Sequence, residues 1–135
     1  MKNTIDFYIG NLNKNTSPDD SDYEELIIKI DFKIDNDFLQ LIKLHNGLSG
    51  PLGSSYVLIW KIQEMIKLNP YYDFIEECSN LFFFGSNGSS LGYAFYKANG
   101  SIVSIEFLDI GIEKPVLIAK SFEDFLVHHF TTTIG

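Results

Sequence analysis

A chain of 135 residues, of which 45% are hydrophobic and 21% charged, has the size and composition of one globular domain and not of a disordered or fibrous protein. Its net charge is −8, and all ten of its basic residues are lysine. Both facts argue against nucleic acids and anionic membranes as partners, because phosphates repel carboxylates and are bound most specifically by arginine. The same charge favours a basic protein partner, and the alternative explanation is that the acidity only keeps the protein soluble.

The single cysteine, Cys78, excludes an internal disulfide framework, so a hydrophobic core must stabilise the fold. The first residues lack the apolar run of a secretory signal peptide, and no later stretch has the length of a membrane-spanning helix. We therefore expect a cytoplasmic protein.

The first half of the chain predicts mainly helices. Residues 1–20 are expected to form an N-terminal extension or a short element, followed by one domain over residues 21–135. Ser21 and Glu24 have the spacing of a capping box, which favours a helix to about Asp31. Apolar residues within 26–34 also alternate with polar ones, so a strand remains possible there. A second helix is expected over residues 37–45, capped by Asp35 or Asn36.

The middle of the chain alternates between loop, strand and helix signals. Three glycines and a proline predict a loop over residues 48–55, and the apolar run 56–60 predicts a buried strand. Helical spacing follows over 61–68. Pro70 is expected either to end this helix or to open a short one over residues 71–78.

The second half predicts an antiparallel meander. Strands are expected over residues 81–84, 92–97, 102–108 and 115–119, and the Asn99-Gly100 pair between two of them is a strong hairpin signal. Val103, Ile105 and Phe107 should face the core from one side of their strand. Ser121 is expected to cap a final helix over 122–130.

Several segments occur in an order that resembles the SUKH superfamily, whose founding members are the Smi/Knr cell-wall-assembly regulators of fungi. A helix ends at Asn46-Gly47, an apolar strand ends at Trp60, and residues 84–88 read Phe-Gly-Ser-Asn-Gly. A hairpin rich in tyrosine and phenylalanine then precedes residues 119–126, Ala-Lys-Ser-Phe-Glu-Asp-Phe-Leu. The match extends over roughly residues 24–130.

This resemblance implies an α+β fold in one domain, with helices packed around a twisted, mainly antiparallel sheet. Bacterial members of the superfamily are mostly immunity proteins that bind and neutralise toxins, often nucleases or deaminases. No catalytic residues accompany the family. Its characteristic positions transfer to this chain as fold determinants, namely Asn46, Gly47, Trp60, Gly85, Gly88, Gly92, Phe122, Phe125 and Leu126.

For the residues that could support catalysis or bind a metal, a structural role explains the sequence better than a catalytic or metal-binding one. Cys78 has no histidine in a supporting sequence context and is expected to be a small buried residue. His128 and His129 are adjacent, so on one helix they point about 100° apart and cannot share a metal ion. Glycines between 85 and 92 lack the lysine and the following helix of a phosphate-binding loop. We therefore expect no catalytic site, metal or cofactor.

Two groups of residues are candidates for binding a partner. The first group is acidic, and the second consists of tyrosines that a small core cannot easily bury with their hydroxyls satisfied. A solvated acidic face and ordinary sheet packing are the alternative interpretations. The candidate residues are Tyr71, Tyr72, Asp73, Glu76, Glu77, Tyr93, Tyr96, Asp109 and Glu113.

The resulting hypothesis is an immunity protein that neutralises a cognate, basic toxin by stoichiometric binding. A regulatory adaptor in cell-wall or envelope assembly is the alternative, as the fungal relatives suggest. A small carboxylate-dependent hydrolase is a third and weaker one, because no sequence feature places paired carboxylates in an apolar pocket.

Overall fold

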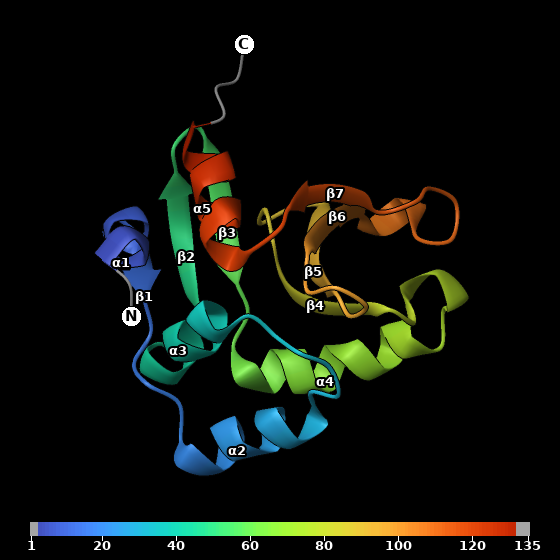
Figure 1. Ribbon diagram of the computed structural model, residues 1–135, viewed down its shortest axis with the longest axis horizontal. Helices are drawn as coiled ribbons and strands as arrows, with labels where there is room; N and C mark the ends of the chain where they lie inside the picture. Colours follow the sequence, from blue (N-terminus) through green and yellow to red (C-terminus); the bar gives the residue numbers. More distant parts are fainter. Residues whose placement is uncertain (1–2, 132–135) are drawn as a thin grey trace.

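The computed structural model describes residues 3–131, which form a seven-stranded antiparallel sheet whose strands follow one another in chain order. The sheet twists so strongly that its second half curls away from its first half (Figure 1). Its strands are β1 (Asn13–Lys14), β2 (Leu48–Leu52), β3 (Ser55–Ile59), β4 (Leu81–Ser86), β5 (Leu91–Tyr96), β6 (Ile102–Glu106) and β7 (Val116–Ala119).

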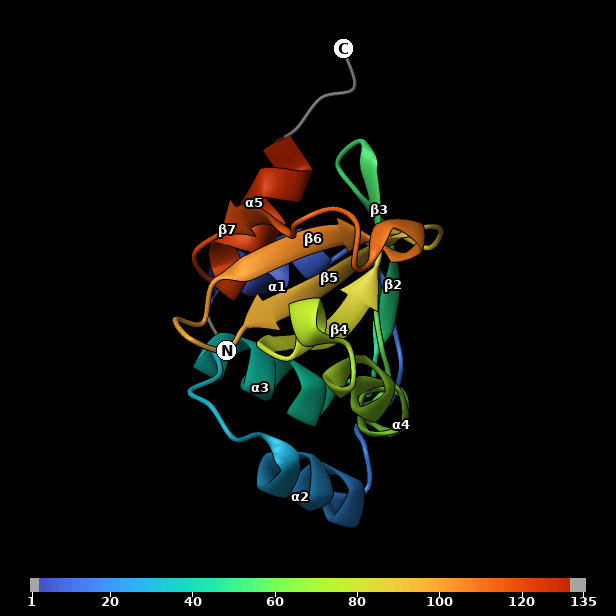
Figure 2. The same cartoon turned by 90° about the vertical axis from the view of Figure 1, so that its right-hand side faces the viewer.

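Helices cover this sheet, as expected for an α+β fold. α1 packs against α5, while α4 lies along β4 and separates the sheet from α2 (Figures 1 and 2). The α-helices are α1 (Asn3–Ile9), α2 (Asp20–Lys29), α3 (Asn36–Leu44), α4 (Ile62–Asp73) and α5 (Phe122–Thr131), and two short 3₁₀ helices are η1 (Glu76–Cys78) and η2 (Phe107–Asp109). Within residues 3–131, none of these helices is long and apolar enough to cross a membrane.

Phenylalanine rings fill the core between the sheet, α3 and α5. Phe38 of α3 has its ring centroid 5.0 Å from that of Phe95 and 5.3 Å from that of Phe122, both in edge-to-face geometry. Phe84 and Phe125 complete this cluster, and all five rings are fully buried. Edge-to-face pairs add to the free energy gained from burial alone, so the high aromatic content stabilises the core.

The N-terminal segment contributes to the same core. Ile5 and Ile9 of α1 and Leu12 before β1 are buried, and β1 pairs with β2. The segment from α1 to β1 is therefore packed on the domain that follows it.

Asp35 joins two helices that are far apart in the sequence. Its Oδ1 accepts hydrogen bonds from the backbone N–H groups of Asp37 and Phe38 at the start of α3, at 2.9 and 3.4 Å. Its Oδ2 accepts one from the N–H group of Phe122 at the start of α5, at 3.0 Å. Helix N-termini carry partial positive charge and unpaired N–H donors, so one carboxylate satisfies donors at both termini.

Asn69 holds α4 against the sheet. Its side-chain amide donates to the carbonyl of Phe83 and accepts from the N–H group of Phe83, at 2.9 and 2.7 Å, as a neighbouring strand would. These bonds act where β4 bulges between Phe83 and Gly85, beside the short pairing of β3 with β4. Asn69 is buried, so losing these bonds would leave polar groups without partners in the interior.

The hairpin predicted at Asn99-Gly100 is confirmed, since β5 and β6 are antiparallel neighbours and Gly100 has a φ of 77°. Val103 and Ile105 are buried as expected. Phe107 lies beyond the strand in η2 and is half-buried, and Ile102 on the opposite side of β6 is also buried. Both faces of this strand are therefore covered, so alternation alone could not identify the core side.

Three local predictions were wrong. The glycine-rich segment expected to be a loop forms β2, because Leu48, Gly50 and Leu52 alternate inward and pair with β3. α4 continues through Pro70 to Asp73 instead of ending there. α2 begins one residue before Ser21, and Asp19 is its N-cap residue, so the Ser21–Glu24 capping box does not form.

The ambiguous segment 26–34 is helical only to Lys29, close to the predicted end, and forms no strand. The cap at Asp35 and the cap of α5 by Ser121, which accepts from the N–H group of Asp124 at 3.1 Å, are as expected.

Replacing Asp35 with alanine should lower the free energy of unfolding by about 2–3 kcal/mol, since each N-cap contributes about 1 kcal/mol and here one side chain serves two helices. Asp19→Ala is the matched control, because the Asp19 side chain makes no capping hydrogen bond, and it should change stability by less than about 0.5 kcal/mol. Urea denaturation of both variants measures the difference. Equal effects would contradict the double role of Asp35.

Candidate partner-binding surface

Four large apolar side chains are exposed on two segments of the chain, Tyr71 and Phe74 at the end of α4 and Leu108 and Ile112 in and after η2. Their exposed fractions are 67% for Tyr71, 91% for Phe74, 87% for Leu108 and 78% for Ile112. Apolar side chains exposed to this extent in one region indicate an interaction surface, because they contribute nothing to the core. This region is at the right of Figure 1.

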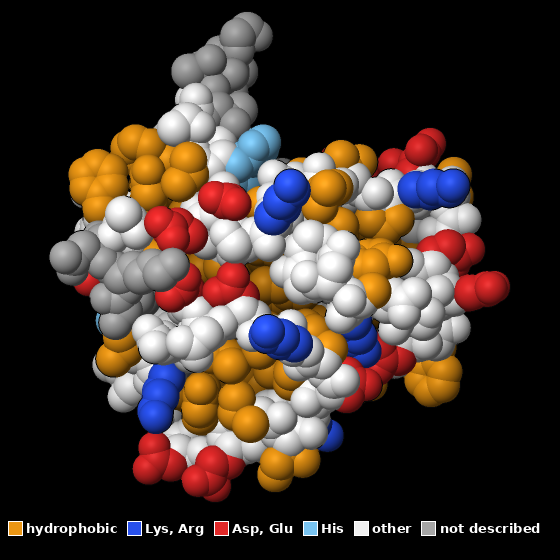
Figure 3. All heavy atoms as spheres, viewed as in Figure 1, with side chains coloured by type: hydrophobic (Ala, Val, Ile, Leu, Met, Phe, Trp, Pro, Cys, Tyr) orange, Lys and Arg blue, Asp and Glu red, His pale blue; other side chains and the backbone are white. Residues whose placement is uncertain are grey.

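Carboxylates surround these apolar side chains. Asp73, Glu76, Glu77 and Glu113 are exposed, and Asp109 is half-buried. Figure 3 shows acidic side chains along the same edge of the molecule, with an apolar group below them. We call this surface the acidic end, defined by Tyr71, Asp73, Phe74, Glu76, Glu77, Leu108, Asp109, Ile112 and Glu113.

Aromatic packing fixes the two segments of the acidic end relative to each other. The Tyr72 ring is stacked on Phe107 with centroids 6.3 Å apart and contacts Phe83 at 4.4 Å. The Phe107 ring lies so close over Gly92 that an added Cβ atom would come within 2.6 Å of it. A side chain at position 92 would displace the Phe107 ring, so glycine there allows η2 to pack closely on the sheet.

The turn after η2 completes the surface. The N–H groups of Ile112 and Glu113 both donate to the carbonyl of Asp109 at 2.9 Å. A Cβ atom on Gly111 would lie 3.8 Å from Oε2 of Glu77, so this turn is beside η1. Residues more than thirty positions apart thus form one surface.

The structure separates the tyrosines that the sequence grouped together. Tyr71 is exposed on the acidic end, and Tyr72 is the half-buried support beneath it. Tyr96 is half-buried elsewhere, in an apolar hollow with Val103 and Leu117. Tyr93 is 2% exposed, so its assignment as a partner-binding residue was wrong.

Tyr93 instead forms a buried pair with His129. The Tyr93 hydroxyl and His129 Nε2 are 2.9 Å apart, and His129 Nδ1 is 3.0 Å from the carbonyl of Phe125. Because a carbonyl only accepts, Nδ1 carries the proton and Nε2 accepts from the hydroxyl. Burial raises the pKa of Tyr93 to about 12, and burial lowers the pKa of His129. Both groups are therefore neutral and serve packing.

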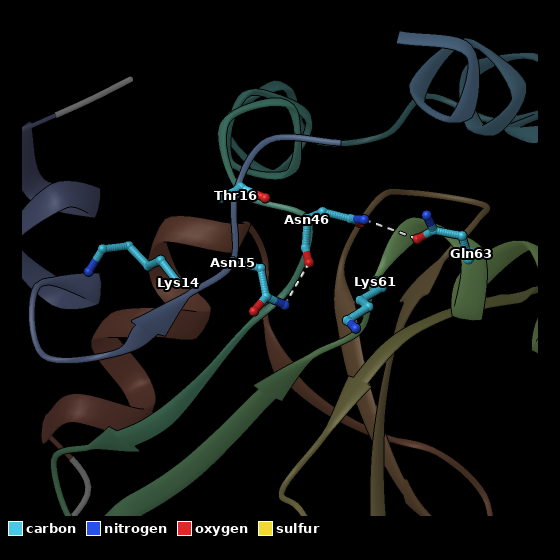
Figure 4. A pocket seen from close by; sticks show the side chains of 6 residues that line it. All are labelled: Lys14, Asn15, Thr16, Asn46, Lys61 and Gln63. Atoms are coloured by element: carbon cyan, nitrogen blue, oxygen red, sulfur yellow. Dashed lines mark hydrogen bonds between the residues drawn. The ribbon is translucent and has the colours of Figure 1, made fainter. Parts of the chain in front are cut away.

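The hollow in Figure 4 is a structural junction. The Asn46 carboxamide accepts from the N–H group of Ile62 at 2.8 Å, which caps α4, and donates to Gln63 at 3.0 Å. Asn15 donates to the Asn46 carbonyl at 2.8 Å, and Lys14 Nζ donates to the carbonyls of Ile9 and Leu12. These polar groups are used to join α1, α3 and α4, which explains Asn46 as a fold determinant.

The remaining residues with catalytic or metal-binding chemistry also form no reactive site on the surface described. Cys78 is fully buried, and burial, followed by the Glu77 carboxylate, raises the pKa of its thiol, which disfavours the reactive thiolate. Among residues 3–131, histidine, cysteine and carboxylate side chains form no group of three that could hold a metal ion.

Sequence reasoning found the acidic residues of this surface but missed Phe74, Leu108 and Ile112. Phe74 follows α4, Leu108 lies within η2 and Ile112 follows it, and nothing in their local pattern distinguishes them from core residues. The available signal was their position among carboxylates, since Phe74 follows Asp73 and Leu108 precedes Asp109.

Truncation of Tyr72 should destabilise the fold far more than truncation of Phe74. Tyr72→Ala removes a ring packed on Phe83 and Phe107 and should cost about 2–4 kcal/mol of unfolding free energy. Phe74→Ala removes a ring that is 91% exposed and should cost less than about 0.5 kcal/mol. Thermal and urea unfolding measure both. A large loss for Phe74→Ala would show that its ring stabilises the fold.

The His129 pair predicts a pH dependence of stability. Because the pKa of His129 is lowered in the folded state, the unfolded chain binds more protons as the pH falls through the ordinary histidine value, and the free energy of unfolding falls with it. His129→Gln can keep both hydrogen bonds without titrating and should flatten this slope between about pH 7.5 and 5.5. His128→Gln, on the exposed side of α5, should keep most of it. Unfolding curves at several pH values test this, and an unchanged slope in His129→Gln would contradict it.

Comparison of the sequence with models of known protein families gives no match, and comparison with curated proteins gives no match either.

Proposed function

We propose that this protein is an immunity protein that binds and neutralises a basic toxin domain through the acidic end. The observation that carries the proposal is the placement of four exposed apolar side chains among five carboxylates on a rigid support. Binding sites between proteins commonly combine apolar anchors with charged groups around them.

The two kinds of side chain have different roles in binding. Phe74 and Tyr71 can be buried by a partner at little cost in conformational entropy, so they are the expected anchors. The carboxylates attract a positively charged surface over several ångströms and so accelerate association. With a net charge of −8, the whole molecule strengthens this attraction.

Toxin neutralisation comes from the resemblance to the SUKH superfamily, whose bacterial members are mostly immunity proteins. The α+β fold with a twisted antiparallel sheet agrees with that resemblance. Binding alone suffices for such a function, and the buried positions of Cys78 and His129 agree with a protein that acts by binding.

The first test uses the gene neighbourhood to choose the toxin. A toxin domain encoded directly upstream should kill a host cell when expressed alone and not when this chain is expressed with it. Survival that does not depend on the chain would contradict the proposal, and an isolated gene would favour the envelope adaptor.

The second test measures binding kinetics with that toxin domain. The double variant Asp73→Lys, Glu77→Lys should lower the association rate constant on the order of tenfold at low salt, because it reverses charge at the site of contact. Glu24→Lys, Glu25→Lys makes the same change in net charge on exposed positions of α2 and is the matched control. Phe74→Ala should weaken binding by about 2 kcal/mol or more. Equal rates for both double variants would show that net charge alone acts.

A further inference from the structure

The two edges of the sheet differ in their protection. β1 is only two residues long and exposes Asn13 and Lys14, both polar. β7 has four residues, and Val116 and Leu117 are 61% and 59% exposed. Edge strands usually carry charges or are very short, because an apolar edge pairs with other chains. Within residues 3–131, β7 pairs only with β6, so its outer edge has no strand beside it.

Side chains on either side of β7 form two different hollows. Leu117 is opposite Val103 and lines an apolar hollow with Tyr96 and Pro115. Val116 is opposite Ser104 and lines a second hollow that contains Glu106, Asp109 and Glu113. Because successive side chains of a strand point to opposite faces, the apolar and the acidic hollow lie on opposite faces of this edge.

The second hollow is continuous with the acidic end, since Asp109 and Glu113 belong to both. Lys114 lines both hollows, and three carboxylates against this one lysine leave the second hollow negatively charged. A partner held at the acidic end is therefore placed beside the open edge of β7.

We propose that the partner adds an extended segment to the outer edge of β7, with apolar and basic side chains in alternation. This inference rests on the proposed function, because it assigns the recognition element of the same basic partner. Backbone hydrogen bonds to β7 would provide affinity. The alternate side chains would provide specificity, the apolar ones in the hollow of Leu117 and the basic ones beside Glu106, Asp109 and Glu113.

A capped peptide of alternating lysine and valine tests the edge without the toxin. In a titration of isotope-labelled protein followed by NMR, the amide signals of residues 116–119 should shift in a saturable way at millimolar concentration or below. A peptide of the same composition with all lysines before all valines should bind about tenfold more weakly, because it cannot alternate across the strand. No shift at β7, or equal binding of the two peptides, would overturn the proposal.

Variants of β7 distinguish this inference from the proposed function. Leu117→Lys should weaken binding of the alternating peptide about tenfold, and Ile28→Lys, at an apolar position on α2 that is 82% exposed, should not. Successive backbone N–H groups of β7 point alternately toward β6 and toward the outer edge, so one of Val116 and Leu117 has its N–H group on the outer edge. Replacing that residue with proline should abolish peptide binding while the protein stays folded.

Full protection and unchanged toxin affinity with Leu117→Lys would overturn strand addition and leave the proposed function intact. Conversely, absence of protection by a chain whose β7 signals respond to the peptide would overturn the proposed function alone.

Discussion

The arrangement of α3 and α5 over the sheet depends on the hydrogen bonds that the Asp35 carboxylate accepts. This carboxylate accepts hydrogen bonds from the N-termini of α3 and α5, and Asp35 is 87 positions from Phe122 in the sequence. The two helices carry Phe38, Phe122 and Phe125, the rings that close the core over β4 and β5. The orientation of this aromatic cluster therefore depends on one half-buried polar group.

Two asparagines have comparable roles at other junctions. Asn46 caps α4 and receives a hydrogen bond from Asn15, and Asn69 pairs with Phe83 where β4 bulges. In each case a side-chain amide or carboxylate satisfies main-chain groups that the strands and helices leave unpaired. With these junctions fixed, Tyr72 and Phe107 support the acidic end. The exposed rings of Tyr71 and Phe74 contribute little to the stability of the fold.

Local signals predicted the elements that short-range chemistry determines. The hairpin at Asn99-Gly100, the cap at Asp35 and the strand predicted over 56–60 depend on few neighbouring residues, and the fold contains all three. The strand was wrongly expected to be buried throughout, since only Val57 and Ile59 face the core and Tyr56 is exposed. β2 was missed because its glycines and proline are unfavourable locally, and only pairing with β3 compensates for them.

α4 extends past Pro70 for a similar reason, since Asn69 and Tyr72 anchor its last turn to β4. The acidic residues of the candidate site were predictable, and its apolar residues were not. The place to which η2 returns is set by contacts distant in sequence, among them the ring of Phe107 over Gly92 and against Tyr72.

The strictly sequential strand order has a consequence for how the chain becomes ordered. β4 to β7 join neighbours across short connections, so little loop-closure entropy opposes their pairing. Contacts of α1 and α3 with α5, and the Asp35 bond to Phe122, close far longer segments of chain. Those contacts should therefore form last and open first. In partly unfolded states, strands β4 to β7 should remain paired after α1, α3 and α5 have separated.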